Sequence, residues 1–529
     1  MDLVNQYLRG LLSGREDGTF HRSLYLWMVP RGSLLCERRL QEHGVFDNFA
    51  AIAELPLLLF KMEPDLVSME MPSAFREWSV HGDPCGVHLS ARALMMLQGL
   101  YGLIPIIRGK GPNVTALYNM MVELRREMAH NEPQIPSKID QLILIDRSID
   151  LLTPLTTQLT YEGLIDQCFG IKNCVVKLPS SRLHQSGGSD GADVMLDQQQ
   201  SAPVKPVLLT SADLLYQELR DANFSSVGPK LAAQAKQITK DFDERHLAKT
   251  VVEMKQFVQK LPRIQQAKQN LALHTSLAEA LQEEVSAGLF GPALQVEQEL
   301  LRGSIDCDKP SPFIEECLGR SAPLFTVLRL MCLQSVINNG LKTKVLEYYK
   351  REVVQTYGYE HMLTLDNLNK AGLLTAQLSK SNYATIRKTL RLIVDDVNEL
   401  NPTDIAYVHS GYAPLSVRLA RYVHSPGWRA ITELLSMLPG PTLSETQQPN
   451  RHKRSDSTSA TGDDAGPVVL IFFIGGCTYS EVAAFRFLSA KSHENGGPEY
   501  ILATTSLVNS NNFLHSLSTD LLPQHTSHP

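Results

Sequence analysis

Four short runs of apolar residues, at 24–29, 141–146, 468–474 and 500–507, have the length and composition of β-strands. The runs at 141–146 and 468–474 are almost continuously apolar, and VVLIFFIGG leads directly into a helical pattern at 479–488. Strands that are buried on both faces of a parallel sheet have this appearance. The flanks of the chain therefore predict an α/β fold.

Helical periodicity dominates from residue 211 to about residue 440, between two segments rich in Ser, Gly, Pro and charge at 180–206 and 441–467. These two segments contain almost no large apolar residues, so we expect mobile linkers that bury nothing. A mainly helical unit is thus predicted as an insertion into α/β segments. The chain from Val468 onward is expected to complete a sheet that begins near Gln141.

The clearest periodicity lies between residues 228 and 285. One half steps by four and three residues from Leu247 to Leu261, and a heptad seam continues the spacing from Ile264 through His274 to Val285. Pro262 lies between the two halves and interrupts helical hydrogen bonding. The pattern predicts either two long helices folded as a hairpin or a single kinked helix.

Charge separates this segment from the rest of the chain. The whole sequence has 50 Lys and Arg against 56 Asp and Glu, a formal charge of −6, which gives no overall basic field for nucleic acid or an anionic membrane. Residues 228–275 instead contain nine basic and four acidic residues, a local charge of +5. One interpretation is a solvated helical face packed on its own domain. The alternative is a projecting arm that offers a heptad groove and positive charge to an acidic partner helix.

No catalytic constellation stands out. The segment 108–111 (RGKG) lacks the hydroxyl residue of a phosphate-binding loop and is interpreted as a loop, and Gly475-Gly476 is interpreted as a tight strand-to-helix turn. Cys477 has no evident base, and helix capping together with a solvent-facing Asp166 explains the acidic residues of 146–166. The eight cysteines form no C-x-x-C pair and are expected to be reduced and mostly buried. An enzyme, of a nucleotide-dependent type on the α/β scaffold, is kept only as the alternative function.

Tyrosines and a methionine cluster in YYKREVVQTYGYEHML, in a chain with only 7% aromatic residues. The cluster contains Tyr348, Tyr349, Tyr357, Tyr359 and Met362. Tyrosine beside lysine and arginine is typical of interface hot spots. Packing of the same side chains into the core of the helical unit is an equal alternative.

The segment 142–173 (LILIDRSIDLLTPLTTQLTYEGLIDQCFGIKN) resembles the strand-to-helix signature of the Sec1/Munc18 (SM) family of membrane-fusion regulators. The segments 29–40, 242–258, 348–361, 401–420 and 472–487 are similar to the vacuolar-protein-sorting branch of this family. The resemblance covers nearly everything outside the two linker segments.

The resemblance implies an α/β plus α arch. Residues 1–137 would be the remainder of an α/β domain one, 138–210 and 466–529 a split α/β domain two, and 211–440 a mainly helical domain three with the basic hairpin at 228–288. Family members open domain one with strand–helix steps that precede the start of this chain. The resemblance therefore implies a truncated first sheet with an unpaired edge.

The resemblance also implies function and partners. It predicts a non-enzymatic regulator that templates and proofreads SNARE bundles within HOPS and CORVET tethering complexes at late endosomes and lysosomes. It implies no cofactor, no nucleic acid and only indirect membrane attachment. The implied partners are SNARE proteins, a helical-repeat class C vacuolar protein sorting subunit of the sixteen type, and other HOPS and CORVET subunits. The implied docking residues for the helical-repeat subunit are Lys350, Tyr359 and Met362. The implied SNARE-contacting residues of the arm are Lys240, Arg245, Lys249, Lys255, Lys260 and Lys268.

Overall fold

The computed structural model describes residues 23–128, 135–179, 204–247, 251–303, 309–447, 466–493 and 497–518. The chain divides into two compact units, Met1–Phe60 and Lys61–Pro529. In the first unit, strands β1 (Leu24–Met28) and β2 (Phe49–Glu54) pair in parallel. Helix α2 (Leu34–Glu42) buries Leu40 beside Val45 in a small core of that unit.

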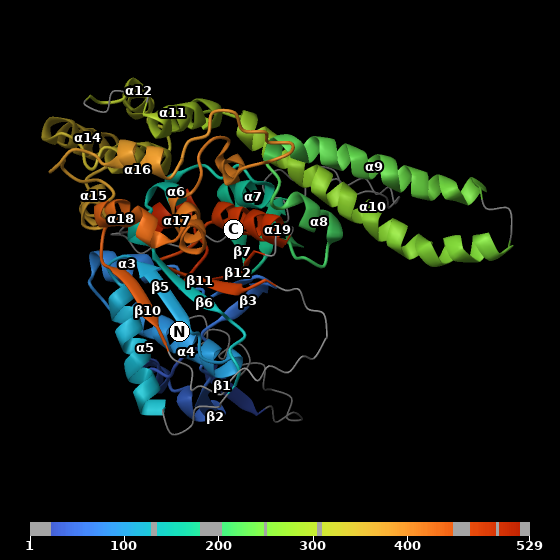
Figure 1. The fold of residues 1–529 in the computed structure, drawn as a ribbon, viewed down its shortest axis with the longest axis horizontal. Helices are drawn as coiled ribbons and strands as arrows, with labels where there is room; N and C mark the ends of the chain where they lie inside the picture. Colours follow the sequence, from blue (N-terminus) through green and yellow to red (C-terminus); the bar gives the residue numbers. More distant parts are fainter. Residues whose placement is uncertain are drawn as a thin grey trace. The chain divides into compact units, whose positions relative to one another are not determined.

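The second unit contains a seven-stranded sheet in the order β10-β5-β6-β11-β12-β4-β3 (Figure 1). Its strands are β3 (Phe60–Glu63), β4 (Leu66–Ser68), β5 (Ile106–Lys110), β6 (Gln141–Asp146), β10 (Thr442–Thr446), β11 (Val468–Ile474) and β12 (Glu499–Thr504). The centre is parallel: β11 pairs with β6 on one side and with β12 on the other. The prediction that the chain from Val468 completes a sheet begun near Gln141 is therefore confirmed.

The boundaries of both predicted linkers need correction, because strands form hydrogen-bonded pairs in parts of the chain that are not apolar runs. The predicted linker 441–467 contains β10, which pairs antiparallel with β5, and the predicted linker 180–206 ends inside β9 (Val204–Leu208). Strand β9 joins β7 (Ile171–Lys172) and β8 (Val175–Pro179) in a separate antiparallel sheet. Residues 108–110 also belong to β5 rather than to a loop, and Gly111 follows the strand. The division at residue 137 remains a prediction, although β5 and β6 on either side of it are neighbours in one sheet.

Three helices lie along the chain between β4 and β6: α3 (Ala74–Val80), α4 (Cys85–Tyr101) and α5 (Val114–Met128). Helix α5 contacts β6 and β10. Helices α6 (Leu152–Leu155) and α7 (Tyr161–Phe169) follow β6. Helix α19 (Tyr479–His493) follows β11 and contacts β12, and α20 (Ser510–Leu517) is the last described helix. Gly475 and Gly476 form the tight turn between β11 and α19 with φ values of 98° and 110°, as predicted.

The described residues between 211 and 440 form helices and no named strand, as the periodicity predicts. The helices are α8 (Leu214–Leu219), α9 (Phe224–Leu247), α10 (Val251–Ser286), α11 (Phe290–Arg302), α12 (Pro312–Gly319), α13 (Leu324–Ile337), α14 (Thr343–Tyr357), α15 (His361–Lys370), α16 (Tyr383–Thr389), α17 (Leu415–His424) and α18 (Thr432–Met437). One continuous hydrophobic core joins α13, α14 and α17 to β6, β11 and β12. The inserted helices therefore share a core with the sheet.

Helices α9 and α10 lie side by side as a hairpin (Figure 1). Helix α9 ends at Leu247, α10 begins at Val251, and Pro262 lies inside α10. The interpretation of Pro262 as the separator of the two helices is therefore wrong. A proline in a helix interior removes one backbone hydrogen bond. A helix of 36 residues that packs along its neighbour retains enough other bonds and contacts to continue through it.

Candidate functional site

The base of the hairpin is the half of α10 between Ile264 and Val285. Ile264 is 8% exposed and Leu281 is fully buried. Leu281 belongs to a core with residues of α7, α8 and the β7-β8-β9 sheet, and Leu271 and Val285 pack against that core. This half of the heptad seam is therefore packed against the chain's own core. The expectation that it forms an open groove is therefore wrong, because periodicity marks an apolar face but does not say what covers it.

His274 fixes this base through polar contacts. Its Nδ1 lies 3.0 Å from the Tyr161 hydroxyl oxygen, and its Nε2 lies 3.0 Å from an Asp213 carboxylate oxygen. The imidazole, 1% exposed, also stacks on the Tyr216 ring with 9° between the planes. Burial acts to raise the pKa of Asp213, but the hydrogen bond from His274 and its charge hold that pKa below its usual value. His274, which occupies a position of the heptad seam in the sequence, thus links α10 to α7 and to the start of α8.

The distal part of the hairpin presents charge. Lys240, Lys255, Lys260 and Lys268 are all exposed. The Arg245 side chain and all of Lys249 lie outside the described residues. Apolar side chains are exposed here as well: Val258 is 59% exposed and Phe242 is 45% exposed. We define the distal arm as the part of α9 and α10 that carries these exposed residues.

A cavity of about 590 Å³ lies where the distal arm meets the base. Ile238 of α9, Leu214 of α8 and Ile264 of α10 contribute apolar surface, while Lys260 and Asp241 add charge of both signs. The cavity has the mixed lining that an amphipathic segment would need. An open concave surface therefore exists beside the distal arm, although it is not the groove that the seam predicts.

The Tyr-rich segment is divided between core and surface. Tyr349 is fully buried, and its hydroxyl donates to Oε1 of Gln334 at 2.8 Å and accepts from the Ser311 backbone N–H at 2.9 Å. The Tyr357 hydroxyl donates to the Ala322 carbonyl at 2.5 Å. The core alternative is therefore correct for these two residues.

Tyr359, Met362 and Leu363 are 77%, 61% and 45% exposed, and we call them the α14–α15 surface. Lys350 on α14 is half-buried. The exposed residues follow the end of α14, where Gly358 with a φ of 111° turns the chain away from the helix. The sequence analysis did not predict Leu363 as an interface residue, although an apolar residue directly after Met362 favours that role.

The segment 142–173 supplies buried ionic links that the sequence does not reveal. Arg147 is fully buried, and its Nη1 lies 2.9 Å from a Glu481 carboxylate oxygen. The same guanidinium lies 3.4 Å from Asp150, and the Ser416 backbone N–H donates to that carboxylate at 3.0 Å. Burial acts against charge on Arg147, but the two carboxylates raise the pKa of its guanidinium above its usual range. This cluster ties β6 to α19 and α17.

A second arginine, Arg486 of α19, has a side chain that is 10% exposed and pairs with carboxylates from three parts of the chain. It pairs with Asp65 at 2.7 Å, Asp221 at 3.0 Å and Glu162 at 3.2 Å. The partners are up to 421 positions away in sequence. No local pattern could have predicted such pairs, because each charged residue alone resembles an ordinary surface residue.

The acidic residues of this segment act mainly as caps. Asp146 accepts from the Ser148 backbone N–H, and Asp150 accepts from that of Thr153. The expected solvent-facing position of Asp166 is wrong: it is 3% exposed and accepts from the Ile171 backbone N–H and from Nδ2 of Asn509. Burial raises the pKa of Asp166 to about 6.

Residues that could have supported chemistry are inside the protein. The Cys477 thiol is fully buried, and burial raises its pKa well above the usual value, so a thiolate nucleophile is disfavoured. Lys110 is 2% exposed and donates to the Gly440 carbonyl at 2.5 Å. Among the described residues, no group of three or more His, Cys, Asp or Glu could hold a metal ion.

A model of the Sec1 family matches residues 8–516. The chain belongs to the Sec1 family. Members of this family are not enzymes. Vacuolar protein sorting-associated protein 33A of Rattus norvegicus is 49% identical over 523 residues, which cover 98% of this chain and 85% of that relative. The protein of the same name from Drosophila melanogaster is 40% identical, over 94% of this chain and 82% of its own length.

Solved structures share the fold of this Sec1-family chain at low identity. The Unc18–syntaxin 1 complex from Monosiga brevicollis aligns with a TM-score of 0.59 and 15% identity, over 97% of this chain and 86% of that one. The SM protein Vps45 in complex with the Qa SNARE Tlg2 aligns with a TM-score of 0.59 and 16% identity, over 96% and 84%. The expected SM-family fold, with α/β segments and a mainly helical insertion, is confirmed. Of the described helices, none has the length and apolar character needed to cross a bilayer.

Proposed function

We propose that this protein is an SM-type regulator of SNARE-mediated vesicle fusion that acts at late endosomes and lysosomes as a subunit of HOPS and CORVET tethering complexes. The observation that carries the proposal is the 49% identity to a vacuolar protein sorting-associated protein 33A along 98% of this chain. The related structures of Unc18 with syntaxin 1 and of Vps45 with Tlg2 support a SNARE as the partner class. In this role the protein preorganises helices and lowers the entropic cost of assembling them.

The distal arm is the proposed SNARE-contacting surface. Its exposed lysines, with the exposed Val258 and the adjacent cavity of about 590 Å³, combine positive charge with apolar surface. An acidic amphipathic helix is complementary to that combination. Because the base seam is covered by the chain's own core, the proposed contact involves the arm's outer surface and this cavity.

The α14–α15 surface is the proposed docking site for the helical-repeat class C vacuolar protein sorting subunit of the sixteen type. Tyr359, Met362 and Leu363 expose apolar area at one helix–helix turn, with Lys350 on the preceding helix. An exposed tyrosine with apolar neighbours is the kind of anchor that dominates binding energy at interfaces. Attachment through such a subunit would bring the protein to a membrane only indirectly.

The two surfaces are tested together by a reciprocal experiment. Replacing Lys255, Lys260 and Lys268 by Glu should abolish pull-down of a preassembled acidic SNARE bundle at low salt and leave capture of the helical-repeat subunit unchanged. The matched control for this loss of charge replaces three exposed lysines elsewhere by Glu: Lys344, Lys380 and Lys388. Bundle binding that survives the arm variant, or that both variants lose equally, would remove the arm from the proposal.

The converse variant, Tyr359→Asp, should abolish capture of the helical-repeat subunit and retain the SNARE bundle. Tyr101→Asp is its control, because it replaces an exposed tyrosine on α4, outside both proposed surfaces, by the same residue. Retained subunit capture by Tyr359→Asp would contradict the docking assignment.

A further inference from the structure

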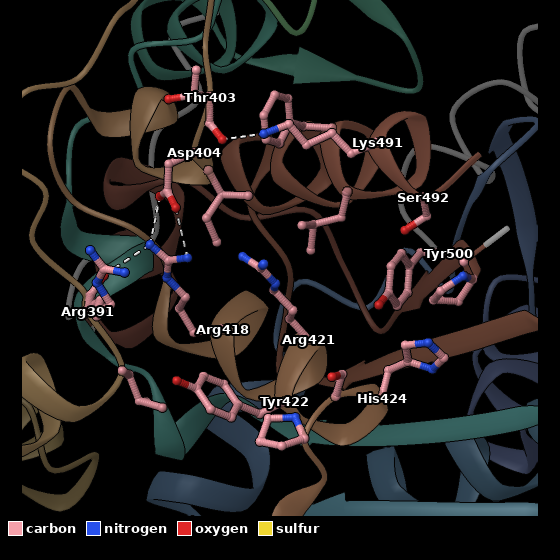
Figure 2. Close-up of a pocket in the computed structure, with 18 of the residues that line it drawn as sticks. Arg391, Thr403, Asp404, Arg418, Arg421, Tyr422, His424, Lys491, Ser492 and Tyr500 are labelled. Atoms are coloured by element: carbon pink, nitrogen blue, oxygen red, sulfur yellow. Dashed lines mark hydrogen bonds and ion pairs between the residues drawn. The ribbon is translucent and has the colours of Figure 1, made fainter. Parts of the chain in front are cut away.

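A cavity of about 840 Å³ lies at a separate place, between α17, α19 and the segments that follow α16 and precede η4 (Ile405–His409) (Figure 2). It does not include residues of the distal arm or of the α14–α15 surface. Its volume falls within the range of about 300–1,000 Å³ that is usual for small-molecule sites. Neither proposed contact uses this cavity.

Positive charge prevails among the charged side chains that line this cavity. Arg418 and Arg421 come from α17, Lys491 comes from α19, and Arg391 follows α16. Asp404 supplies the single carboxylate among the described lining residues. Figure 2 shows these side chains around the cavity. Cations from three separate elements therefore converge on one concave surface.

Only one of these charges is neutralised by that carboxylate. Arg418 is nearly buried and forms a two-bond pair with Asp404, at 2.7 and 3.1 Å. It also donates to the Arg391 carbonyl at 3.0 Å, which anchors the backbone that carries the next guanidinium. The Arg391 and Arg421 guanidinium groups form no hydrogen bond or ion pair with a described residue. The lining thus retains two arginines that are available to an added anion.

Helix polarity explains part of this charge but not all of it. Arg421 and His424 lie in the last turn of α17, where positive charge is favoured by the helix dipole. That effect is confined to one helix end and does not bring Arg391 or Lys491 to the same cavity. Arg418 lies three positions before Arg421 on the same helix, but its charge is already paired with Asp404. An anion between the elements would instead pair with the guanidinium groups of Arg391 and Arg421.

The arrangement of the cations favours a compact anion. An acidic helix or strand extends along many residues, whereas the unpaired cations of this site line a single cavity. Guanidinium groups bind phosphate oxygens through paired hydrogen bonds, and a lysine adds a point charge. We propose that this cavity binds a compact ligand with two or more phosphate groups, held by Arg391 and Arg421. Lys491, whose ammonium donates to the Thr403 carbonyl and lies 4.6 Å from the Phe487 ring centre, adds positive charge beside them. The same chemistry belongs to a soluble phosphorylated polyol and to a phosphorylated lipid headgroup.

The test uses the full chain and two probes. Isothermal calorimetry with inositol trisphosphate measures the soluble form, and flotation with phosphatidylcholine vesicles, with and without phosphatidylinositol bisphosphate, measures the headgroup. The variant is Arg391→Asn with Arg421→Ala; asparagine is chosen because Arg391 has a φ of 51°, which asparagine tolerates. Loss of two charge-assisted contacts should weaken binding by about tenfold or more.

The matched control is Arg38→Ala with Arg126→Ala, which removes two exposed arginines outside the cavity. Binding by the wild type and by the control, but not by the cavity variant, supports the proposal. Response to both probes or to vesicles alone then identifies the source of the phosphates. Absence of binding to both probes, or equal binding by the cavity variant, overturns the proposal. Binding of an acidic peptide without either phosphate probe also overturns it and makes this cavity a protein contact.

Discussion

The base of the hairpin and its distal arm share one helical repeat but differ in what covers them. At the base, His274 and Leu281 are buried against α7 and α8, and Leu281 shares a core with the small antiparallel sheet. In the distal arm, Val258 follows the same spacing yet is 59% exposed beside exposed lysines. The comparison teaches that a heptad pattern identifies a continuous apolar stripe, and that packing divides this stripe into an anchored half and an available half.

The largest expected effect is at the base. Leu281→Ala should lower the free energy of unfolding by about 2–5 kcal/mol, because it removes a fully buried side chain and leaves a cavity. Urea denaturation of the full chain measures it. A loss below about 1 kcal/mol would mean that the base is as loosely packed as the distal arm.

Stability should also depend on pH in a distinctive way through Asp166 of α7, which lies outside the hairpin. Burial raises its pKa to about 6, from an ordinary value of 3.8, so the folded state keeps a proton that the unfolded state releases. Its contribution is therefore fully present below about pH 4 and is lost as the pH rises through about 6, with an upper bound of about 3 kcal/mol.

Unfolding of the wild type and of Asp166→Asn at several pH values between these limits isolates this contribution. The stability of the variant should fall less steeply as the pH rises. Identical slopes in the two proteins would show that Asp166 titrates as an ordinary carboxyl group.

A smaller effect is expected at His274. His274→Ala should cost about 1–3 kcal/mol, because it leaves the buried Tyr161 hydroxyl without its imidazole partner. Arm binding to a SNARE bundle should remain when the protein is assayed below its unfolding temperature. If binding disappears while the fold persists, the base and the distal arm are coupled more closely than their burial indicates.

The smallest expected effect on stability is at the distal arm. Val258→Ala should change the free energy of unfolding by less than about 0.5 kcal/mol, because the side chain is mostly in water already. It should nevertheless weaken capture of the SNARE bundle if the arm offers apolar contact as well as charge. Unchanged capture would restrict the arm's role to electrostatics.

The sequence was sufficient where a signal is local. The apolar runs at Gln141–Asp146 and Val468–Ile474 became strands at those positions, and the helical repeat after residue 211 became helices. The glycine pair at 475–476 became the turn between strand and helix. Tyr359 and Met362 were predicted as interface residues and are exposed, although their role remains a prediction.

Tertiary structure alone decided which patterns were covered and which charges met. Only packing shows that α10 continues through Pro262, that its seam is closed at the base, and that Asp166 is buried. Only the folded chain brings Arg147 to Glu481, 334 positions away, and Arg391 to the cavity that Arg421 also lines. The physical reason is that local spacing records the preference of each segment for water or for an apolar environment. The neighbour that satisfies this preference comes from distant parts of the chain.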